Sequence, residues 1–234
     1  MITKDTTAHR GDVVEVSGRR VGDVGRTGEI LDVLGAPGHP HYLVRWEDGH
    51  ESVFFPGEGT RIRTKAPAAP GPQATPGLAR VTAQLVELLG EAGIEFELLR
   101  HRRTTSATGE ARALGVLAQT VAKTLIARDD EGNCVRAVVP ASSRLDLARL
   151  AEAVDAKTVR LLSEEDLVLM YPQFEPGAVP PFGGPAGDRV VVDPRLAERE
   201  HVVLDAGAHD VSLRLRADDL LTVANAQLVD IATG

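Results

Sequence analysis

Short apolar runs separated by glycine, proline and charged residues dominate the first 65 positions. Runs of this length, rich in valine and punctuated by turn residues, are typical of strands. Asp48-Gly49 separates two of them and is a strong signal for a tight hairpin turn. The pattern predicts five short strands that form a small all-β barrel of SH3-like type. The clearest of these strands are expected at 13–16, 29–34, 41–46 and 52–55.

After residue 77 helical and strand periodicities alternate along the chain. Apolar residues recur at helical spacing over 78–92, and Gly93 is suited to end that helix. Thr108 is expected to cap a second helix with Glu110 in its first turn, and Asp146 a third. The fold class expected here is α+β with a mixed sheet. Its strands are expected at 94–99, 121–128, 134–140, 158–162, 189–193, 201–205 and 211–216.

A proline-rich segment separates the two patterns. Residues 66–77 read APAAPGPQATPG, and prolines at this density disfavour both helix and sheet. The sequence therefore predicts a small barrel at 1–65, a semi-extended linker at 66–77 and a second domain at 78–234.

Composition narrows the class of protein. No stretch approaches the roughly 18 apolar residues of a membrane span, and the first residues lack the apolar run of a signal peptide. Cys134 is the only cysteine, so an internal disulfide is impossible and a buried strand residue is expected. These features favour a cytoplasmic protein without a membrane partner.

The net charge of −8 argues against coating a long nucleic-acid backbone, and so against a DNA-binding protein. A protein that touches only the tip of an RNA need not be basic. Residues 100–103, Arg-His-Arg-Arg, form the clearest basic cluster. They are either a solvated loop or an RNA contact.

Lys123 is the first candidate for chemistry. In a strand over 121–128 it shares a face with Val121, Leu125 and Ala127. A lysine on an apolar face is costly unless it has a partner, lines a cavity, or extends to water at a sheet edge. The pattern marks Lys123 as a functional candidate beside that structural alternative.

Residues 175–185 form a second candidate, because four prolines and three glycines in this segment rule out a helix or an inner strand. Such a loop can present backbone N–H groups to a carbonyl oxygen or a ribose. It can equally be a rigid connector.

Residues 205–210 form a third candidate, a turn between two strands that contains His209. Asp205, His209 and Ser142 or Ser143 resemble a catalytic triad only weakly, since no nucleophile elbow surrounds either serine. Three N-terminal histidines at positions 39, 41 and 50 fall in turns without an acidic ligand set, so no metal is expected. No P-loop or dinucleotide fingerprint is present, and no cofactor is expected.

Four segments together resemble the YbaK/prolyl-tRNA editing family, in matching order over about residues 78–232. They are Ala113–Val116 with Val121–Leu125, Ala137–Pro140 with Arg144–Leu147, Gly177–Gly183, and Asp205–Gly207. This family consists of α+β domains that remove a wrong amino acid from tRNA, either alone or within prolyl-tRNA synthetase. The first 65 residues are similar to an uncharacterised small domain of actinobacterial proteins, which implies no function.

The resemblance implies that Lys123 is the central catalytic residue and that the loop from Gly177 to Gly183 positions the aminoacyl ester. It implies a trans-editing aminoacyl-tRNA deacylase that acts on a small amino acid such as alanine or cysteine, with the proline tRNA as default. Its partners would be the acceptor end of aminoacyl-tRNA and an aminoacyl-tRNA synthetase or another protein. The residues expected to bind substrate are Thr124, Pro180, Pro181, Phe182, Gly207 and His209.

Two rival readings come from other classes of protein. The fold can bind tRNA or another ligand without hydrolysing it, with the N-terminal barrel recruiting a partner. It can also be an unrelated hydrolase of small esters or amides. The sequence leaves open whether Lys123 stabilises an oxyanion, anchors the substrate or acts as a base, and which group attacks the ester.

Overall fold

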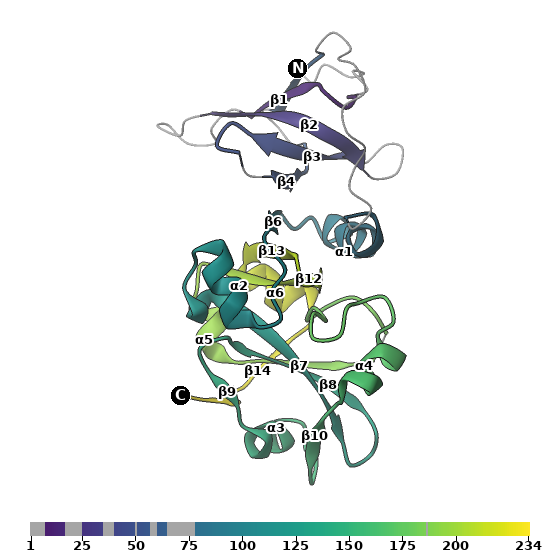
Figure 1. Ribbon diagram of the computed structural model, residues 1–234, viewed down its shortest axis with the longest axis vertical. Coiled ribbons are helices and arrows are strands. Elements are labelled where there is room, and N and C mark those ends of the chain that lie inside the picture. The colour runs from purple at the N-terminus through teal and green to yellow at the C-terminus, as the bar shows by residue number, and fades with distance from the viewer. Residues whose placement is uncertain are drawn as a thin grey trace.

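The structure is a computed structural model that describes residues 8–16, 25–34, 40–49, 51–56, 60–64, 78–185 and 187–234, with side chains of the second region from residue 84 onward. The expected linker at 66–77 lies outside the described residues, as do His39 and His50. A 13-stranded mixed sheet runs through both regions of the chain (Figure 1). The predicted α+β class is confirmed.

The N-terminal strands follow the order β5-β1-β2-β3-β4, with every neighbouring pair antiparallel. This connectivity is consistent with the small barrel predicted from the sequence. Gly49 has φ of +87° and its N–H donates to the Trp46 carbonyl over 2.9 Å, so the predicted Asp48-Gly49 hairpin is present. The strands are β1 (Val13–Val16), β2 (Arg26–Leu34), β3 (His41–Trp46), β4 (Glu51–Phe54) and β5 (Thr60–Arg63).

In the second region the sheet continues in the order β14-β11-β8-β7-β12-β13-β6. β7 pairs antiparallel with β8 and parallel with β12, so it lies at the centre of this part. The main strands are β6 (Phe96–Arg100), β7 (Val121–Asp129), β8 (Cys134–Pro140), β10 (Val159–Leu161), β11 (Arg189–Val192), β12 (His201–Ala208) and β13 (Val211–Arg216). Short strands are β9 (Arg144–Leu145), β14 (Gln227–Leu228) and β15 (Ala232–Thr233). All seven strands predicted here are present, within a few residues at their ends.

The helices are α1 (Leu78–Glu91), α2 (Ala107–Leu114), α3 (Leu147–Ala153), α4 (Glu164–Met170), α5 (Pro194–Ala197) and α6 (Ala217–Val223), with a 3₁₀ turn at Ala118–Thr120. Asp146 caps α3 as predicted, because its side chain accepts from the N–H groups of Ala148 and Arg149. The cap of α2 is Ser106, whose side chain accepts from the Gly109 N–H, so the prediction of Thr108 was wrong by two residues. Helices α4, α5 and α6 were not predicted.

The two regions are joined by backbone pairing. β4 of the N-terminal region pairs antiparallel with β6, with Ser52 opposite Glu97 and Val53 opposite Phe96. Figure 1 shows the N-terminal strands above this junction, with α1 beside it. A Cβ at Gly90 of α1 would lie 3.1 Å from Phe55, so the helix approaches the barrel closely at that point.

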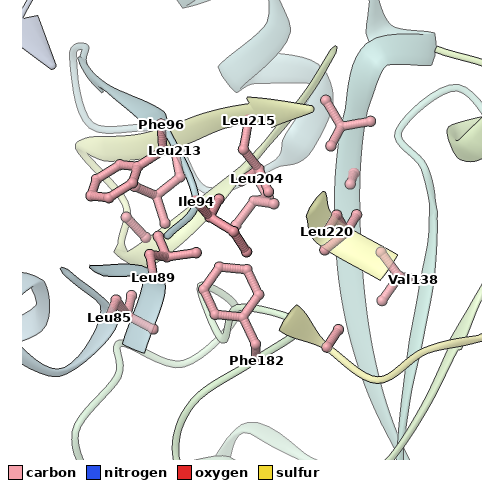
Figure 2. Packing of buried hydrophobic residues seen from close by; sticks show 14 of the residues in the cluster. Leu85, Leu89, Ile94, Phe96, Val138, Phe182, Leu204, Leu213, Leu215 and Leu220 are labelled. Carbon is pink, nitrogen blue, oxygen red and sulfur yellow. The ribbon is translucent and has the colours of Figure 1, made fainter. Parts of the chain in front are cut away.

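One apolar cluster crosses this junction. Leu43 and Val53 belong to the same buried cluster as Leu85, Leu89 and Phe96. Figure 2 shows the part of this core in which Phe182, Leu204, Leu213 and Leu215 pack around Ile94. Ile30, Tyr42, Val44 and Trp46 form a separate cluster inside the barrel. Cys134 is buried in β8, as predicted.

Leu43→Ala should therefore destabilise the second region as well as the barrel. Truncation of a buried leucine costs about 2–5 kcal/mol of unfolding free energy, and Leu43 is 7% exposed. We expect faster hydrogen exchange at the β6 amides of residues 96–98, measured by NMR or mass spectrometry. Val33→Ala in β2, at a position 38% exposed, is the matched control. Unchanged exchange in β6 would contradict a shared core.

Candidate active site

A cavity of about 340 Å³ opens beside β7, between the start of α2, the segment from β10 into α4, and the loop of residues 175–185, called here the glycine–proline loop. Lys123 and Thr124 line it from β7, and Gly177 and Val179 from the loop. This volume lies near the lower end of the roughly 300–1,000 Å³ typical of ligand sites. The other lining residues are Thr105, Ser106, Ala107, Thr108, Leu125, Ile126, Ala141, Leu161, Leu162, Leu167 and Asp205.

Lys123 is held at the cavity by its strand and by one hydrogen bond. It pairs with Val139 of β8, and its Nζ donates to the Ser143 carbonyl over 3.0 Å. Burial lowers the pKa of the Lys123 ammonium, and the nearby charge of Arg144 lowers it further. A lysine ammonium has three N–H donors, so the bond to Ser143 leaves two for a ligand.

The glycine–proline loop is fixed from below by a buried arginine. Arg136 of β8 is 2% exposed, and its Nη1 donates to the Pro180 carbonyl over 2.8 Å. Its Nη2 lies 2.7 Å from the carboxylate of Asp188, which also accepts from the Tyr171 hydroxyl over 2.8 Å. Burial and the hydrogen bond to Asp188 raise the pKa of Tyr171, so that the phenol stays a donor. The loop therefore rests on a fully paired buried network.

The start of the loop is fixed by the β12–β13 turn. His209 Nε2 lies 2.9 Å from the Pro176 carbonyl, and the His209 backbone N–H donates to Glu175 over 2.8 Å. Glu175 also accepts from Arg103 over 3.0 Å. Burial raises the pKa of Glu175, but the bonds from Arg103 and His209 outweigh it and the pKa is lowered overall. Arg103, from the basic cluster, thus helps to anchor the loop.

The expected site residues separate into two groups. Lys123, Thr124 and Gly177 line the cavity together. Phe182 is 4% exposed within the apolar core, and a Cβ at Gly183 would lie 2.9 Å from Leu85. Pro180 and Pro181 belong to the loop and are buried. These four residues are outside the set that lines the cavity, so the structure places them as supports of the loop.

Gly207, near the end of β12, and His209, in the β12–β13 turn, also contact the loop. Gly207 is buried, has φ of +89°, and accepts from the Glu175 N–H over 2.9 Å. The His209 ring bonds to Pro176 of the loop, away from Ser142 and Ser143. Ser143 instead offers its carbonyl to Lys123.

Several polar residues of the cavity were not expected in this role. Asp205 of β12 was named only in a weak triad and in the family resemblance, and Thr108 only as a helix cap, yet both line the cavity. Thr105 and Ser106, at the start of α2, were not singled out and also line it. Asp205 follows three buried apolar residues of a strand, which is a signal that marks a polar residue at the end of a buried segment. The described residues hold no cluster of three His, Cys, Asp or Glu side chains arranged for a metal ion. None of their helices is long and apolar enough to cross a membrane.

The sequence profile described as "Aminoacyl-tRNA editing domain" matches residues 101–223, a segment that contains every residue lining the cavity. The chain belongs to the aminoacyl-tRNA editing domain family. A second profile, for a domain of unknown function named DUF1918, matches residues 6–62. The predicted resemblance of the second region to an editing domain is confirmed.

Editing-domain relatives with assigned activities match the second region. The multifunctional Ser/Thr-tRNA deacylase ProXp-y of Escherichia coli K12 is 29% identical over 153 residues, which cover 63% of this chain and 90% of the relative. A predicted Cys-tRNA(Pro)/Cys-tRNA(Cys) deacylase of Enterococcus faecalis, EbsC, is 27% identical over 143 residues, covering 59% and 84%.

Solved structures share the fold of the second region. A crystal structure of a hypothetical protein superposes with a TM-score of 0.60 at 26% identity, covering 64% of this chain and 99% of that one. A candidate trans-editing enzyme for prolyl-tRNA synthetase gives 0.61 at 23% identity, covering 69% and 100%. At that identity the second match shows the fold alone.

Arg136→Met should destabilise the editing domain strongly. It leaves the Asp188 carboxylate buried without its cation, a change that costs about 3–5 kcal/mol of unfolding free energy. The double variant with Asp188→Asn should lose less, because no uncompensated charge remains. Urea unfolding measures both, with exposed Arg112→Met on α2 as the control. Equal losses for Arg136→Met and the control would show that the pair does not support the loop.

Proposed function

We propose that this protein is a trans-editing aminoacyl-tRNA deacylase that hydrolyses the ester bond of mischarged aminoacyl-tRNA. One observation carries the proposal. Lys123 and the Gly177 end of the glycine–proline loop line the same cavity, inside the segment that matches the editing family. The names of the two relatives, both tRNA deacylases, support the same reaction class.

In this reaction Lys123 acts as a fixed cation. Attack on an ester carbonyl builds negative charge on its oxygen, and donors that are oriented beforehand stabilise that charge most effectively. The bond to Ser143 orients the Lys123 ammonium, while apolar neighbours such as Leu125 reduce its hydration. Thr124 and Gly177 then flank the ester from the strand and from the loop.

The substrate is a small amino acid on the acceptor end of tRNA. The cavity volume of about 340 Å³ suits an aminoacyl group and part of a ribose rather than a whole tRNA end. Alanine and cysteine are the first candidates and the proline tRNA the default carrier, with serine and threonine added by the name of the Escherichia coli relative. An aminoacyl-tRNA synthetase is the proposed protein partner.

Lys123→Ala should abolish most of the deacylation of a mischarged tRNA. Removal of one preorganised donor typically lowers kcat by about 10²–10³-fold. The assay measures release of labelled alanine, cysteine, serine or threonine from tRNA(Pro) and from their own tRNAs. Lys157→Ala, at an exposed position, is the matched control and should retain wild-type rates.

Three outcomes of that assay differ in meaning. Release by the wild type that is lost only in Lys123→Ala supports the proposal and names the substrate. Activity on free amino-acid esters without RNA would favour a small-ester hydrolase. Tight tRNA binding by a folded protein that releases no amino acid would replace the enzyme with a binding module.

Deacylation should also decline on the alkaline side at a pH below the usual lysine value of 10.5, because burial and Arg144 lower the pKa of Lys123. Above that pKa the ammonium is lost, and with it the stabilisation of the oxyanion. Arg144→Gln removes the repelling charge, so the decline should move to higher pH. Rates are measured after subtraction of uncatalysed ester hydrolysis. An unmoved decline would show that Lys123 is not the group responsible.

A further inference from the structure

Two carboxyl groups interact electrostatically at the cavity wall, and neither has a role in the function proposed above. Glu110 of α2 is 1% exposed, and Asp205 of β12 lines the cavity. One oxygen of Glu110, Oε2, is buried and has no hydrogen-bond partner among the described residues. A buried carboxyl oxygen without a partner costs stability.

Sheet register brings Asp205 and Lys123 to the same face of the sheet. β12 runs parallel to β7, with Val203 opposite Val121 and Leu204 opposite Ala122. Asp205 and Lys123 are the next residues of the two strands, where this pairing ends. Val203 and Val121 pack in the same cluster, and strand periodicity turns Asp205 and Lys123 towards that same side. A carboxyl group and an ammonium group therefore line one cavity from adjacent strands.

A chain of hydrogen bonds connects Glu110 to the protein surface. The Ser212 hydroxyl of β13 bonds to Glu110 Oε1, and His101 Nε2 lies 2.8 Å from the Ser212 hydroxyl. His101 is half-buried, and its Nδ1 lies 2.9 Å from the Arg102 carbonyl, so Nδ1 carries a hydrogen.

Two of the hydrogen placements that satisfy these bonds differ in the protonation state of Glu110. In one, Glu110 is ionised, Ser212 donates to it and His101 is doubly protonated. In the other, Glu110 is protonated and donates to Ser212, which donates to a neutral His101. The two placements differ by transfer of one proton from one end of the chain to the other.

Electrostatics couple this chain to Asp205. Burial, and then the charge of Glu110, raise the pKa of Asp205 well above its usual value. Burial also raises the pKa of Glu110, while the Ser212 hydrogen bond and the charges of His101 and His209 lower it. Two carboxyls that repel each other in this way ionise in two separate steps. Three other titratable groups surround the pair. His101 follows β6, Lys123 lies in β7, and His209 lies in the β12–β13 turn.

We propose, building on the deacylase function, that Asp205 is a catalytic residue that carries a proton during ester hydrolysis, and that Glu110 is a positioning residue that sets the proton occupancy of Asp205. The Asp205 carboxylate takes one proton from the attacking water as the water oxygen bonds to the ester carbon. The bond from that carbon to the ribose oxygen then breaks, and Asp205 returns its proton to the ribose oxygen. The freed amino acid ionises and releases one proton to solvent.

In the same steps Lys123 stabilises the negative charge on the carbonyl oxygen. Lys123 and Asp205 therefore have separate tasks. Ionisation of Glu110 keeps the proton on Asp205, whereas protonation of Glu110 frees Asp205 to act as a base. Ser212 and His101 decide between these states, because they stabilise the ionised form of Glu110.

Asp205→Asn tests the catalytic role directly. The carboxamide keeps the size of the side chain but cannot take up a proton, so kcat for deacylation should fall about 10²-fold or more, with KM within about threefold of wild type. Glu152→Gln on the exposed side of α3 is the matched control and should leave both values unchanged. Circular dichroism and thermal unfolding establish that each variant is folded.

Glu110→Gln tests the positioning role, with an outcome that a purely structural residue would not produce. Removal of the Glu110 charge lowers the pKa of Asp205, so the acidic limb of the kcat profile should move down by about one pH unit. Ser212→Ala should move the limb in the same direction by less, because loss of its hydrogen bond favours protonated Glu110. A pH titration followed by carboxyl ¹³C NMR should show that the pKa of Asp205 moves towards its usual value of 3.8 in these variants. This measurement does not depend on activity.

The possible outcomes separate this inference from the function on which it rests. Wild-type kcat in Asp205→Asn, or an unmoved acidic limb in both Glu110→Gln and Ser212→Ala, would overturn the inference and leave the deacylase standing. A folded wild-type protein that hydrolyses no aminoacyl-tRNA would overturn both. Loss of activity in Asp205→Asn together with the downward shift in Glu110→Gln would support it.

Discussion

The parallel pairing of β7 with β12 is the interaction on which the site depends. β7 carries Lys123 and β12 carries Asp205, and their register brings two residues 82 positions apart in sequence to the same side of the sheet. β8 on the other side of β7 holds Arg136, which anchors the loop, and leads into Ser143, whose carbonyl orients the lysine. A slip of one residue between β7 and β12 would turn one of the two charged side chains to the opposite face. The arrangement of charged groups at the cavity therefore depends on the register of β7 and β12.

The second constraint is the free-energy cost of burying charged side chains. Arg136 is buried and is paired with Asp188 and a loop carbonyl. These interactions offset the free-energy cost of burying the guanidinium, and they hold the loop in place. Glu110 is buried and only partly paired, and its charge acts on Asp205, which lines the cavity. The same sheet thus holds one buried ion pair that supports structure and one buried acid pair whose protonation can change. Perturbed acids with a specific charge partner in a cavity are typical of functional sites.

Much of this arrangement could be predicted from the sequence, and the exceptions have physical causes. Strands such as 134–140 were found because β-branched residues and flanking turns mark them clearly, and Lys123 was found because a lysine is costly on an apolar face. The α2 cap was placed at Thr108 instead of Ser106 because several adjacent serines and threonines are chemically equivalent as caps. Phe182 was expected at the substrate because it lies in the glycine–proline loop, yet it is the large apolar side chain that ties the loop to the core. The Glu110–Asp205 pair could not be found, because only the register of distant strands brings its members together.

The continuity of the sheet from β4 into β6 has a mechanical consequence. A proline-rich connection between two domains suggests a hinge, but a hinge also needs an interface that can separate, and here backbone pairing and one apolar cluster span the junction. From the barrel to the lysine strand the path crosses β6, β13 and β12 without leaving the sheet (Figure 1). Movement of the N-terminal region against the cavity would therefore have to break the β4–β6 pairing and open the shared apolar cluster.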